Sequence, residues 1–338
     1  MRSLTKWISA AVLGGMLMNS AALAADVIRV RLDWSPWGNQ APFHLAQKLG
    51  TFAKYNLDVK MDDGNGSVAT VQIVGNGEYD VGHASLASMA IARSKGLPIR
   101  AFAGFVRRND TGLIVDKGSG ITKPADLKGK KLAFTAGSLE TPFLDRFLAA
   151  GNLKRSDVEL VNVDAAAKAG TYMAGRADGA FSSVPFILAV ANQQRPSTSI
   201  NFADYGLNFP SFGLFATEQK LAEKSDAFRR LASVLAGTWT YILAGHEDEA
   251  VQAIIEARPQ SKLNAGVLRT QIDTLKDFIY TPATRNEPIG FQAASDWAEA
   301  IKTLSDGGLI AGSPDPATFF TNDMIDPKIV AEVSRGGK

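Results

Sequence analysis

Two short segments of the sequence repeat one pattern and limit the possible fold more than any other feature. They are Gly77-Glu78-Tyr79-Asp80-Val81-Gly82 and Gly175-Arg176-Ala177-Asp178-Gly179-Ala180. Each places a glycine at the end of a predicted helix, an aspartate in the turn, and small residues where a strand ends. Glycine at a helix C-terminus tolerates the left-handed conformation that stops the helix. Because the pattern occurs twice in matching contexts, the sequence predicts two lobes of related build.

Strand and helix patterns alternate around both segments. Upstream, strands are expected at 27–32, 57–61 and 79–82, with helices at 43–50 and from 67 to 75 or 77. Downstream, strands are expected at 131–134, 158–163 and 179–181, with one helix opening at Gly137-Ser138 and another ending at Gly175. A returning strand at 212–217 and amphipathic helices such as 227–243 follow. This alternation favours an α/β fold with largely parallel sheets.

The first residues carry the pattern of an export signal. Arg2 and Lys6 precede an uncharged apolar run at 7–18, and Ala22-Leu23-Ala24 supplies the small residues that signal peptidase accepts. This predicts a signal peptide over residues 1–24, cleaved near Ala24. The run is shorter than the roughly 20 residues of a membrane-spanning helix. We therefore expect a mature protein in the periplasm, without a lipid anchor because no cysteine is present.

Charge and cysteine content exclude several classes of protein. The chain has 36 basic and 34 acidic residues, and removal of Arg2 and Lys6 leaves 34 of each. This balance argues against a nucleic-acid partner. The absence of cysteine excludes disulfides, thiolate metal sites and a cysteine nucleophile. Neither a G-x-S-x-G motif nor paired histidines occur, so we predict no enzyme, no metal and no cofactor, although a hydrolase that uses carboxylates stays open.

Ligands of open α/β sheets bind outside the carboxyl ends of the strands, so the turns after strands supply the candidate residues. In the first turn, Trp34 and Trp37 offer large faces for stacking, and Trp34 could equally pack in the core. Gln40 could bond a neutral ligand or cap a helix. Asp33 could hold a ligand amine or cap the turn.

The next turns of the first lobe add four candidates. Ser67 opens a helix, and Ser85 could bind a ligand or cap the following helix. His83 is a single histidine and so no metal site; it could face the cleft or lie buried. Phe105 belongs to the core or walls an aromatic ligand. The pair Arg107-Arg108 could reach a ligand anion or lie on the solvated surface.

The second lobe adds five candidates. Gly137 and Ser138 precede a predicted helix, whose backbone N–H groups would favour an anion such as a sulfonate. Glu140 and the missing donor of the neighbouring proline weaken that prediction. Ser182 and Ser183 could supply hydroxyls to a ligand or form a polar loop.

Several motifs, in their order along residues 27–186, carry a resemblance to a known family. They are Leu32-Asp33-Trp34-Ser35-Pro36, Gly50-x-Phe52 with Leu57-Asp58-Val59, Gly77-x-x-Asp80-x-Gly82, Asp126-Leu127-Lys128-Gly129-Lys130-Lys131-Leu132, and Gly175-x-x-Asp178-Gly179-Ala180 with Pro185. This set resembles the thiamine-precursor, sulfonate, taurine and nitrate group of periplasmic solute-binding proteins. The resemblance implies the extracytoplasmic component of an ABC importer, a monomer that delivers a small-molecule ligand to a membrane permease.

The resemblance also implies an architecture. It is the type II periplasmic-binding-protein fold, with two lobes that each contain a mostly parallel sheet flanked by helices. Lobe 1 would comprise residues 25–115 and 209–338, and lobe 2 would be an insertion at 116–208. Two crossings of the chain would join them.

Departures from the family pattern bear on the ligand. Trp37 and Gln40 replace the usual asparagine and histidine of the thiamine-precursor branch, and Val184 stands where an acid is common. The related eukaryotic pyrimidine synthases carry a cysteine-rich segment that this chain lacks. We expect a small planar or heteroaromatic metabolite as ligand. An alkyl or aryl sulfonate or another organic anion at Ser138 is the alternative, and an exported enzyme on the same fold is the second alternative.

Overall fold

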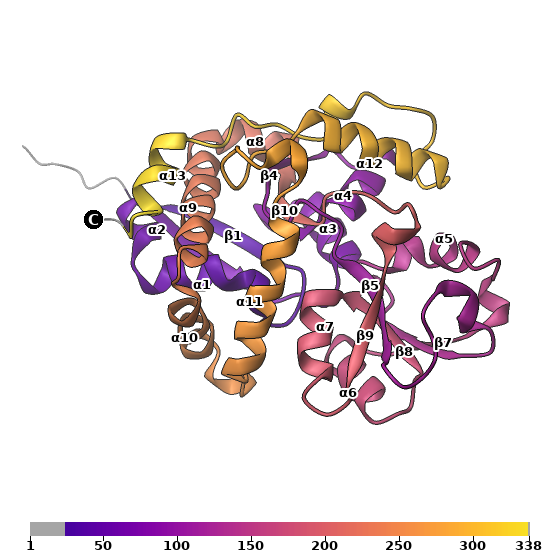
Figure 1. Ribbon diagram of the computed structural model, residues 1–338. Coiled ribbons are helices and arrows are strands. Elements are labelled where there is room, and N and C mark those ends of the chain that lie inside the picture. Colours follow the sequence, from indigo (N-terminus) through magenta and orange to yellow (C-terminus); the bar gives the residue numbers. More distant parts are fainter. Residues whose placement is uncertain (1–23, 337–338) are drawn as a thin grey trace, which may run out of the picture.

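The computed structural model describes residues 24–336, which form two five-stranded sheets with helices packed on them (Figure 1). The predicted signal peptide lies outside the described residues, apart from Ala24. We call the sheet and helices of residues 26–104 and 212–333 lobe A, and those of residues 111–205 lobe B. Within residues 24–336, no helix is both long and apolar enough to cross a membrane.

The sheet of lobe A has the order β2-β1-β3-β10-β4. Its strands are β1 (Asp26–Leu32), β2 (Leu57–Asp62), β3 (Val81–Ser85), β4 (Ile99–Gly104) and β10 (Phe212–Thr217). β1 pairs in parallel with β2 and β3, whereas β10 is antiparallel to both of its neighbours. The helices between these strands are α1 (Ala41–Lys48), α2 (Thr51–Lys54), α3 (Ser67–Gly75) and α4 (Leu86–Ser94).

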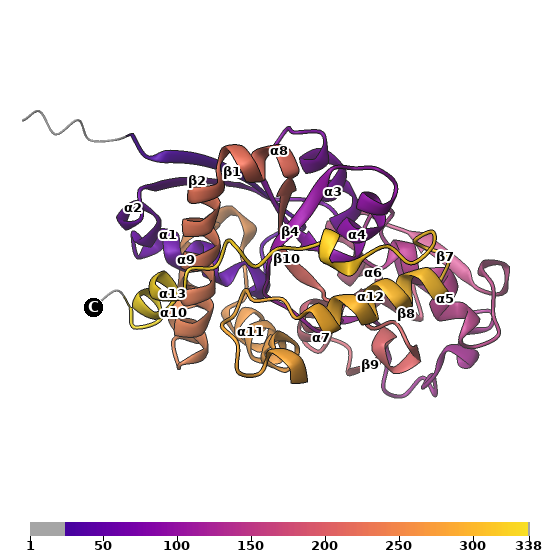
Figure 2. The ribbon, with the colours of Figure 1, turned by 90° about the horizontal axis from the view of Figure 1, so that it is seen from above.

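The last third of the chain is mainly helical and belongs to lobe A. It contains α8 (Glu218–Glu223), α9 (Ser225–Leu243), α10 (Glu247–Ala257), α11 (Ala265–Ile279), α12 (Ala294–Asp306) and α13 (Pro327–Val333). The amphipathic helix α9 buries its apolar face against the sheet, where Phe228 stacks on Phe102 of β4 at 5.3 Å between ring centres. Seen from above, α11 lies beside α7 of lobe B (Figure 2). A lobe A helix thus reaches the boundary between the lobes.

Lobe B repeats the plan with the order β7-β6-β8-β5-β9. Its elements are β5 (Thr111–Asp116), β6 (Lys131–Phe134), α5 (Leu144–Ala149), β7 (Glu159–Asn162), α6 (Ala165–Met173), β8 (Gly179–Ser183), α7 (Val184–Ala191) and β9 (Ser197–Asn201). β6 is parallel to β7 and β8, and β5 is antiparallel to β8 and β9. Lobe B therefore has the same strand directions as lobe A.

Two crossings join the lobes, at residues 105–110 and 206–211. Each delivers the chain into the other sheet as its one antiparallel strand, β5 after the first crossing and β10 after the second. The predicted boundary between residues 115 and 116 falls inside β5. Because β5 pairs with β8 and β9, the first boundary is corrected to lie before Thr111.

The repeated Gly-x-x-Asp pattern has one geometry in both lobes. Asp80 accepts a hydrogen bond from the backbone N–H of Arg29 at 2.9 Å, and Asp178 accepts one from Lys131 at 2.8 Å. In each lobe the aspartate thus ties the turn to the start of the neighbouring strand. The glycines after α3 and α6 take the expected left-handed conformation, with φ of 83° at residue 77 and 69° at residue 175.

Two predicted elements are wrong in their position. The third strand begins at Val81 and runs to Ser85, since Tyr79 and Asp80 belong to the turn. The helix expected at Gly137-Ser138 begins only at Leu144, after a 3-10 turn at Thr141–Phe143. Pro142 has no N–H for an earlier helical turn. The N–H of Ser138 donates to the carbonyl of Thr135 at 3.1 Å and is not free.

Candidate functional site

A narrow pocket lies between the lobes, at the carboxyl ends of β1, β6 and β8. Its walls are Asp33, Trp34, Trp37 and Phe212 from lobe A, and Ser138, Leu139, Ser182, Ser183 and Phe186 from lobe B. The free space inside is about 10 Å³, roughly what one water molecule needs. A ligand larger than water therefore enters only when the two walls separate.

Aromatic rings form one side of the pocket. Phe186 of α7 presents its edge to both indoles, 6.2 Å from Trp34 and 5.5 Å from Trp37 between ring centres. Trp37 also meets Phe212 at 5.7 Å. Both indole N–H groups are buried, and that of Trp34 has no hydrogen-bond partner among the described residues. The indole of Trp37 lies close enough to the Asp33 carboxyl to act as a hydrogen-bond donor that lowers its pKa. The wall thus offers flat apolar faces together with one unused donor, the N–H of Trp34.

The pocket lining contains one carboxyl group, that of Asp33, and the carboxyl of Asp110 lies nearby. Asp33 is 2% exposed, and its Oδ1 has no hydrogen-bond partner within the described chain. Burial, with the nearby charge of Asp110, raises the pKa of Asp33 to about 8. Asp110 lies in the first crossing and accepts hydrogen bonds from Ser183 at 2.5 Å and from Ser211 of the second crossing. Burial raises the pKa of Asp110 to about 6.

A buried ion pair lies in lobe B beside the pocket, outside its lining. Lys168 donates to Glu140 at 2.6 Å and to the carbonyl of Phe181 at 2.9 Å, and both charged side chains are fully buried. Burial lowers the pKa of Lys168. Its Nζ lies 5.0 Å from the ring centre of Trp34, across the lobe boundary. Glu140, a predicted ligand residue, is thus occupied by Lys168.

The anion site predicted at Ser138 loses its physical basis. The helix that would have supplied N–H groups begins six residues later, at Leu144. Ser138 still lines the pocket, and its buried hydroxyl has no partner in the part of the chain that the structure describes. None of the described lining residues is basic. The pocket therefore suits a hydrogen-bonding ligand better than an anion.

The boundary between the lobes is closed by backbone contacts at its rim. The carbonyl of Gly137 in lobe B accepts hydrogen bonds from Val68 at 2.9 Å and Ala69 at 3.4 Å, at the N-terminus of α3 in lobe A. A Cβ on Gly66 would collide with that same carbonyl. Close approach of two backbones explains a glycine at Gly66.

Several predicted site residues lie outside the pocket lining. Gln40 donates to the carbonyl of Trp34 at 3.1 Å and so holds the tryptophan turn. Ser67 accepts from the N–H of Ser85 at 3.2 Å, and Ser85 caps α4 by accepting from Ser88 at 3.3 Å. These three side chains stabilise the turns, and none of them lines the pocket.

His83 lies in the core of lobe A and not in the pocket. Its ring packs against Phe43, Phe212 and Phe105, at 5.1, 5.9 and 6.1 Å between ring centres. Burial lowers the pKa of His83 to about 3, so the imidazole is neutral at physiological pH. Phe105 is likewise fully buried.

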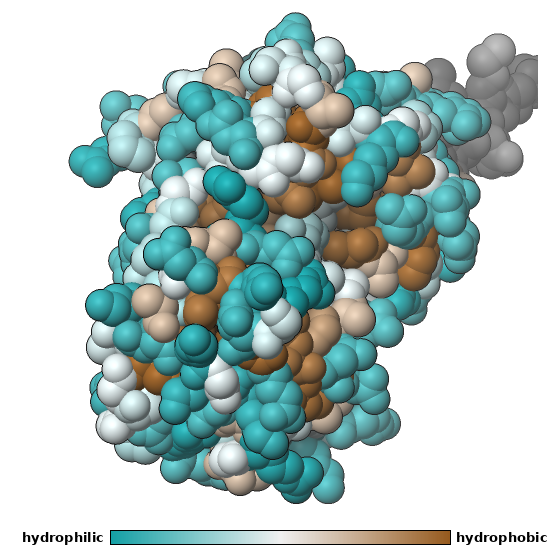
Figure 3. All heavy atoms as spheres, turned by 90° about the vertical axis from the view of Figure 1, so that its right-hand side faces the viewer, coloured by the Kyte–Doolittle hydropathy of each residue, from teal (hydrophilic) through white to brown (hydrophobic). Residues whose placement is uncertain are grey.

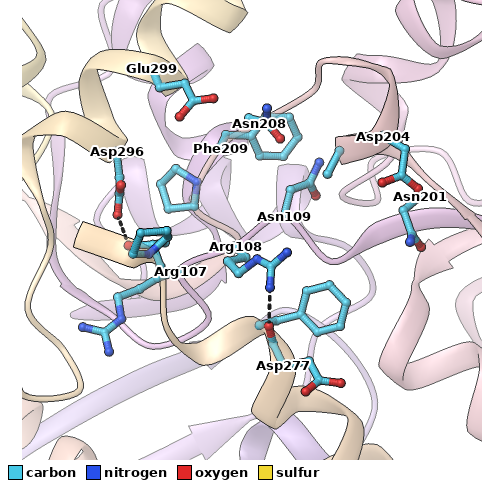
Figure 4. Close-up of a pocket in the computed structure, with 15 residues that line it drawn as sticks. Arg107, Arg108, Asn109, Asn201, Asp204, Asn208, Phe209, Asp277, Asp296 and Glu299 are labelled. Carbon is cyan, nitrogen blue, oxygen red and sulfur yellow. Dashed lines mark hydrogen bonds between the residues drawn. The ribbon is translucent and has the colours of Figure 1, made fainter. Parts of the chain in front are cut away.

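A larger hollow, of about 410 Å³, lies beside the two crossings (Figure 4). Its walls include Arg108 and Asn109 of the first crossing, Asn208 and Phe209 of the second, and Asp296 of α12. It does not lie at the carboxyl ends of the parallel strands, and its lining mixes polar side chains with Phe209, Pro210, Phe278 and Pro282. We therefore do not assign the ligand to it.

The sequence allowed two roles for Arg107, contact with a ligand anion or a place on the solvated surface, and the structure shows neither of them. Arg107 is 3% exposed and donates to the carbonyls of Ile279, Pro288 and Phe291. In Figure 4 its guanidinium points away from the centre of the hollow. The residue fastens the first crossing to the C-terminal part of lobe A.

Sequence reasoning found Asp33, Trp34 and Trp37 of lobe A and the serines but missed Leu139 and Phe186 of lobe B. It also missed Lys168, which pairs with Glu140, and Asp110 of the first crossing. Phe186 follows Pro185 in a predicted turn, which was the available signal. On the face of the molecule with lobe B toward the viewer, hydrophilic side chains dominate and hydrophobic ones show mainly in the hollowed middle (Figure 3).

Comparison with known proteins finds one matching family and several sequence relatives. A family model described as NMT1/THI5 like matches residues 37–250. The formylaminopyrimidine-binding protein of Halalkalibacterium halodurans is 23% identical over 291 residues, which cover 83% of this chain and 85% of that protein. A 4-amino-5-hydroxymethyl-2-methylpyrimidine phosphate synthase of Saccharomyces cerevisiae is 30% identical over 113 residues, 33% of each chain.

Solved structures share the fold. A protein from Bordetella bronchiseptica RB50 superposes with a TM-score of 0.73 at 23% identity, covering 92% of this chain and 97% of that one. The alkanesulfonate-binding protein of Xanthomonas axonopodis pv. citri, bound to MOPS, gives a TM-score of 0.67 at 16% identity, with coverages of 87% and 98%. These likenesses confirm the predicted two-lobed fold.

Proposed function

Because the chain belongs to the NMT1/THI5-like family, we propose that it is the solute-binding component of an ABC importer. The observation that carries this proposal is the pocket between the lobes, which has indole, carboxyl and hydroxyl groups on its walls and no room until the lobes part. The formylaminopyrimidine-binding relative, matched over most of both chains, supports the same role. A membrane permease would be the partner that receives the ligand.

The place of action that we propose is the periplasm. The predicted signal peptide over residues 1–24 would direct export and be removed near Ala24. Binding proteins such as the alkanesulfonate-binding neighbour have the same two-lobed fold. We propose a monomer, since one chain contains both walls of the pocket.

The mechanism that we propose is capture by closure. The two crossings act as the hinge, and Asp110 with Ser211 ties them together beside the pocket. Ligand first contacts the Trp34–Trp37 turn of lobe A, and lobe B then rotates until Phe186 and the serines cover it. The closed form is favoured by as much as the ligand prefers it over the open form.

For the ligand, we propose a planar heteroaromatic compound that donates hydrogen bonds. The indole faces suit a flat ring, and the unpartnered Oδ1 of Asp33 suits an amino group or ring N–H. The indole N–H of Trp34 and Ser138 suit ring nitrogens. A sulfonate remains the alternative, and it has weaker support because the pocket lining contains no basic residue and no helix N-terminus.

Calorimetric titration with three probes tests the ligand class. The probes are formylaminopyrimidine, MOPS and nitrate, and we expect heat of binding only from the first. Replacing Trp37→Leu should weaken its binding about 30-fold, about 2 kcal/mol, through lost stacking and apolar contact. The control Tyr241→Leu changes a half-buried aromatic of α9 outside the pocket lining and should leave affinity unchanged.

Other results would separate the alternatives. Tight binding of MOPS or nitrate would replace the heteroaromatic ligand by an anion and keep the transport role. Conversion of formylaminopyrimidine into a new compound would support the exported enzyme instead. The synthase relative matches only a third of this chain, so we regard that alternative as the weaker one.

A further inference from the structure

Gln271 of α11 makes a hydrogen bond to each side of the lobe boundary. Its Oε1 accepts from the backbone N–H of Gly38 at 2.9 Å, within lobe A. Its Nε2 donates to the carbonyl of Phe186 at 3.1 Å, within lobe B. The side chain is 2% exposed. One buried amide thus uses its acceptor on one lobe and its donor on the other, and we call this pair of bonds the Gln271 bridge.

Both ends of the Gln271 bridge are next to the pocket wall. Gly38 directly follows Trp37, and Phe186 is the residue whose ring contacts both Trp34 and Trp37. A Cβ on Gly38 would come within 2.8 Å of the Gln271 Cβ, so the tryptophan turn is packed tightly onto α11. The bond of the Gln271 Oε1 to Gly38 is therefore fixed within lobe A, and the Nε2 group points toward lobe B, where it meets the Phe186 carbonyl.

We propose that Gln271 is a positioning residue that stabilises the closed form and so slows release of the ligand. In the closed form its donor holds the Phe186 carbonyl and sets the Phe186 ring against both indoles. When the lobes part, the bond to Gly38 stays and the bond to Phe186 is exchanged for water. This inference rests on the proposed function, because the bridge matters only if the lobes open and close around a ligand.

The expected size follows from the energetics of one hydrogen bond. A buried bond between neutral groups contributes about 0.5–1.5 kcal/mol net. Its loss should raise the open population, and the dissociation rate of the ligand, about 3- to 10-fold. The other bonds across the boundary, between Gly137 and the start of α3, do not involve the Trp37 turn. They would persist in a Gln271 variant.

Gln271→Glu separates the two ends of the bridge. The new carboxylate can still accept from the N–H of Gly38, but it has no hydrogen for the Phe186 carbonyl and repels that oxygen. Gln271→Met removes both bonds and measures their sum. The control Gln219→Glu makes the same change of charge on the surface of α8, where Gln219 donates to Glu223 at 2.7 Å.

Opening of the lobes can be measured without any ligand. Because the chain has no cysteine, Ala166→Cys in lobe B and Ser261→Cys in lobe A give one spin label on each exposed surface. Double electron–electron resonance then gives the fractions of short and long distances. We expect the long-distance fraction to rise about 3- to 10-fold in Gln271→Glu and to stay at the original value in Gln219→Glu.

Dissociation kinetics supply a second readout with formylaminopyrimidine as the probe. At about pH 8 the Gln271→Glu protein should release it about 3- to 10-fold faster than the original protein. Near pH 5 protonation of the new carboxyl restores a donor, so this ratio should fall toward one. Rates are compared as ratios at each pH because Asp33 and Asp110 also titrate beside the pocket.

The possible failures are distinguishable. A single narrow distance that no probe changes, in the original protein, would overturn the proposed function. Two distance populations that respond to formylaminopyrimidine or MOPS but not to Gln271→Glu would overturn the bridge and leave the function standing. A rate ratio that is independent of pH would likewise contradict the role of the donor.

Discussion

Asp33 and Asp80 are two shielded aspartates of lobe A with opposite chemistry. Asp33 lies after β1, at the carboxyl end of the sheet, and Asp80 lies before β3, at the amino end. They are 2% and 6% exposed. Burial raises the pKa of Asp33 to about 8. Burial alone would also raise the pKa of Asp80, but hydrogen bonds from Arg29 and two lysines outweigh it and lower that pKa.

The difference lies in the supply of donors. Asp80 accepts from the backbone N–H of Arg29 and from Lys220 and Lys224, at 2.9, 2.7 and 3.0 Å. Asp33 keeps one oxygen without a partner among the described residues. A buried acceptor without a donor costs stability, so its retention points to a functional role. The amino end of the sheet is therefore built for stability, and the carboxyl end leaves an acceptor for a ligand.

The largest expected effect comes from removing Asp80, at the amino end of the lobe A sheet. Asp80→Ala leaves two lysines and one backbone N–H without their acceptor and should lower the free energy of unfolding by about 3 kcal/mol. Asp178→Ala, the same turn in lobe B, removes one bond near the surface and should cost about 1 kcal/mol. Urea denaturation at neutral pH measures both. Equal losses would contradict a contribution from the lysines.

The stabilisation that Asp80 contributes also depends on pH in a defined way. The pKa of Asp80 is lower in the folded protein than in the unfolded chain, where it is about 3.9. Its stabilisation is therefore complete above the unfolded value and is lost as the pH falls through the folded value. The difference between the original protein and Asp80→Ala should shrink in acid.

Asp33→Asn should have an effect of the opposite sign. The folded protein holds the Asp33 proton up to about pH 8, whereas the unfolded chain loses it near 3.9. Stability therefore falls as the pH rises between these values, by at most about 1.4 kcal/mol for each pH unit. An amide avoids that loss, so the variant should be more stable than the original protein near pH 8.5 by a few kcal/mol at most, with no gain near pH 4.

Paired urea titrations at the two pH values measure this difference. Asp110 titrates in both proteins, so its contribution cancels in the comparison. A gain of the same size at both pH values would show that packing, and not the charge of Asp33, is responsible.

The sequence was sufficient for features that depend on neighbouring residues. Strand alternation, the glycine helix stops and the paired aspartate turns follow from local chemistry, and the structure confirms them. The rule that ligands bind after strands selected Asp33, Trp34 and Trp37, which do line one pocket. These predictions need only the order of residues along one element.

Features that depend on what lies across a boundary were not predictable in this way. Phe186 lies in a helix whose apolar periodicity gives its buried face but not the opposing indoles. Lys168 and Glu140 lie on separate elements, and nothing in either segment indicates the other. The helix predicted at Ser138 failed because Pro142 delays its first turn. Spatial pairing of distant segments decides each of these cases.

The smallest effect tests how far the contrast between the two aspartates depends on solvent. Lys224 lies 3.0 Å from Asp80 but is 37% exposed, so Lys224→Met should cost only about 0.5 kcal/mol. Lys220, closer at 2.7 Å and 24% exposed, should cost about 1 kcal/mol. At about 1 M salt, where the screening length is about 3 Å, the Lys224 effect should vanish.

The pH-dependent gain of Asp33→Asn should persist, because burial and not a solvated charge causes it. If salt removed both effects equally, the carboxyl end of the sheet would be as open to solvent as the amino end, and the assignment of Asp33 as a shielded ligand acceptor would fail.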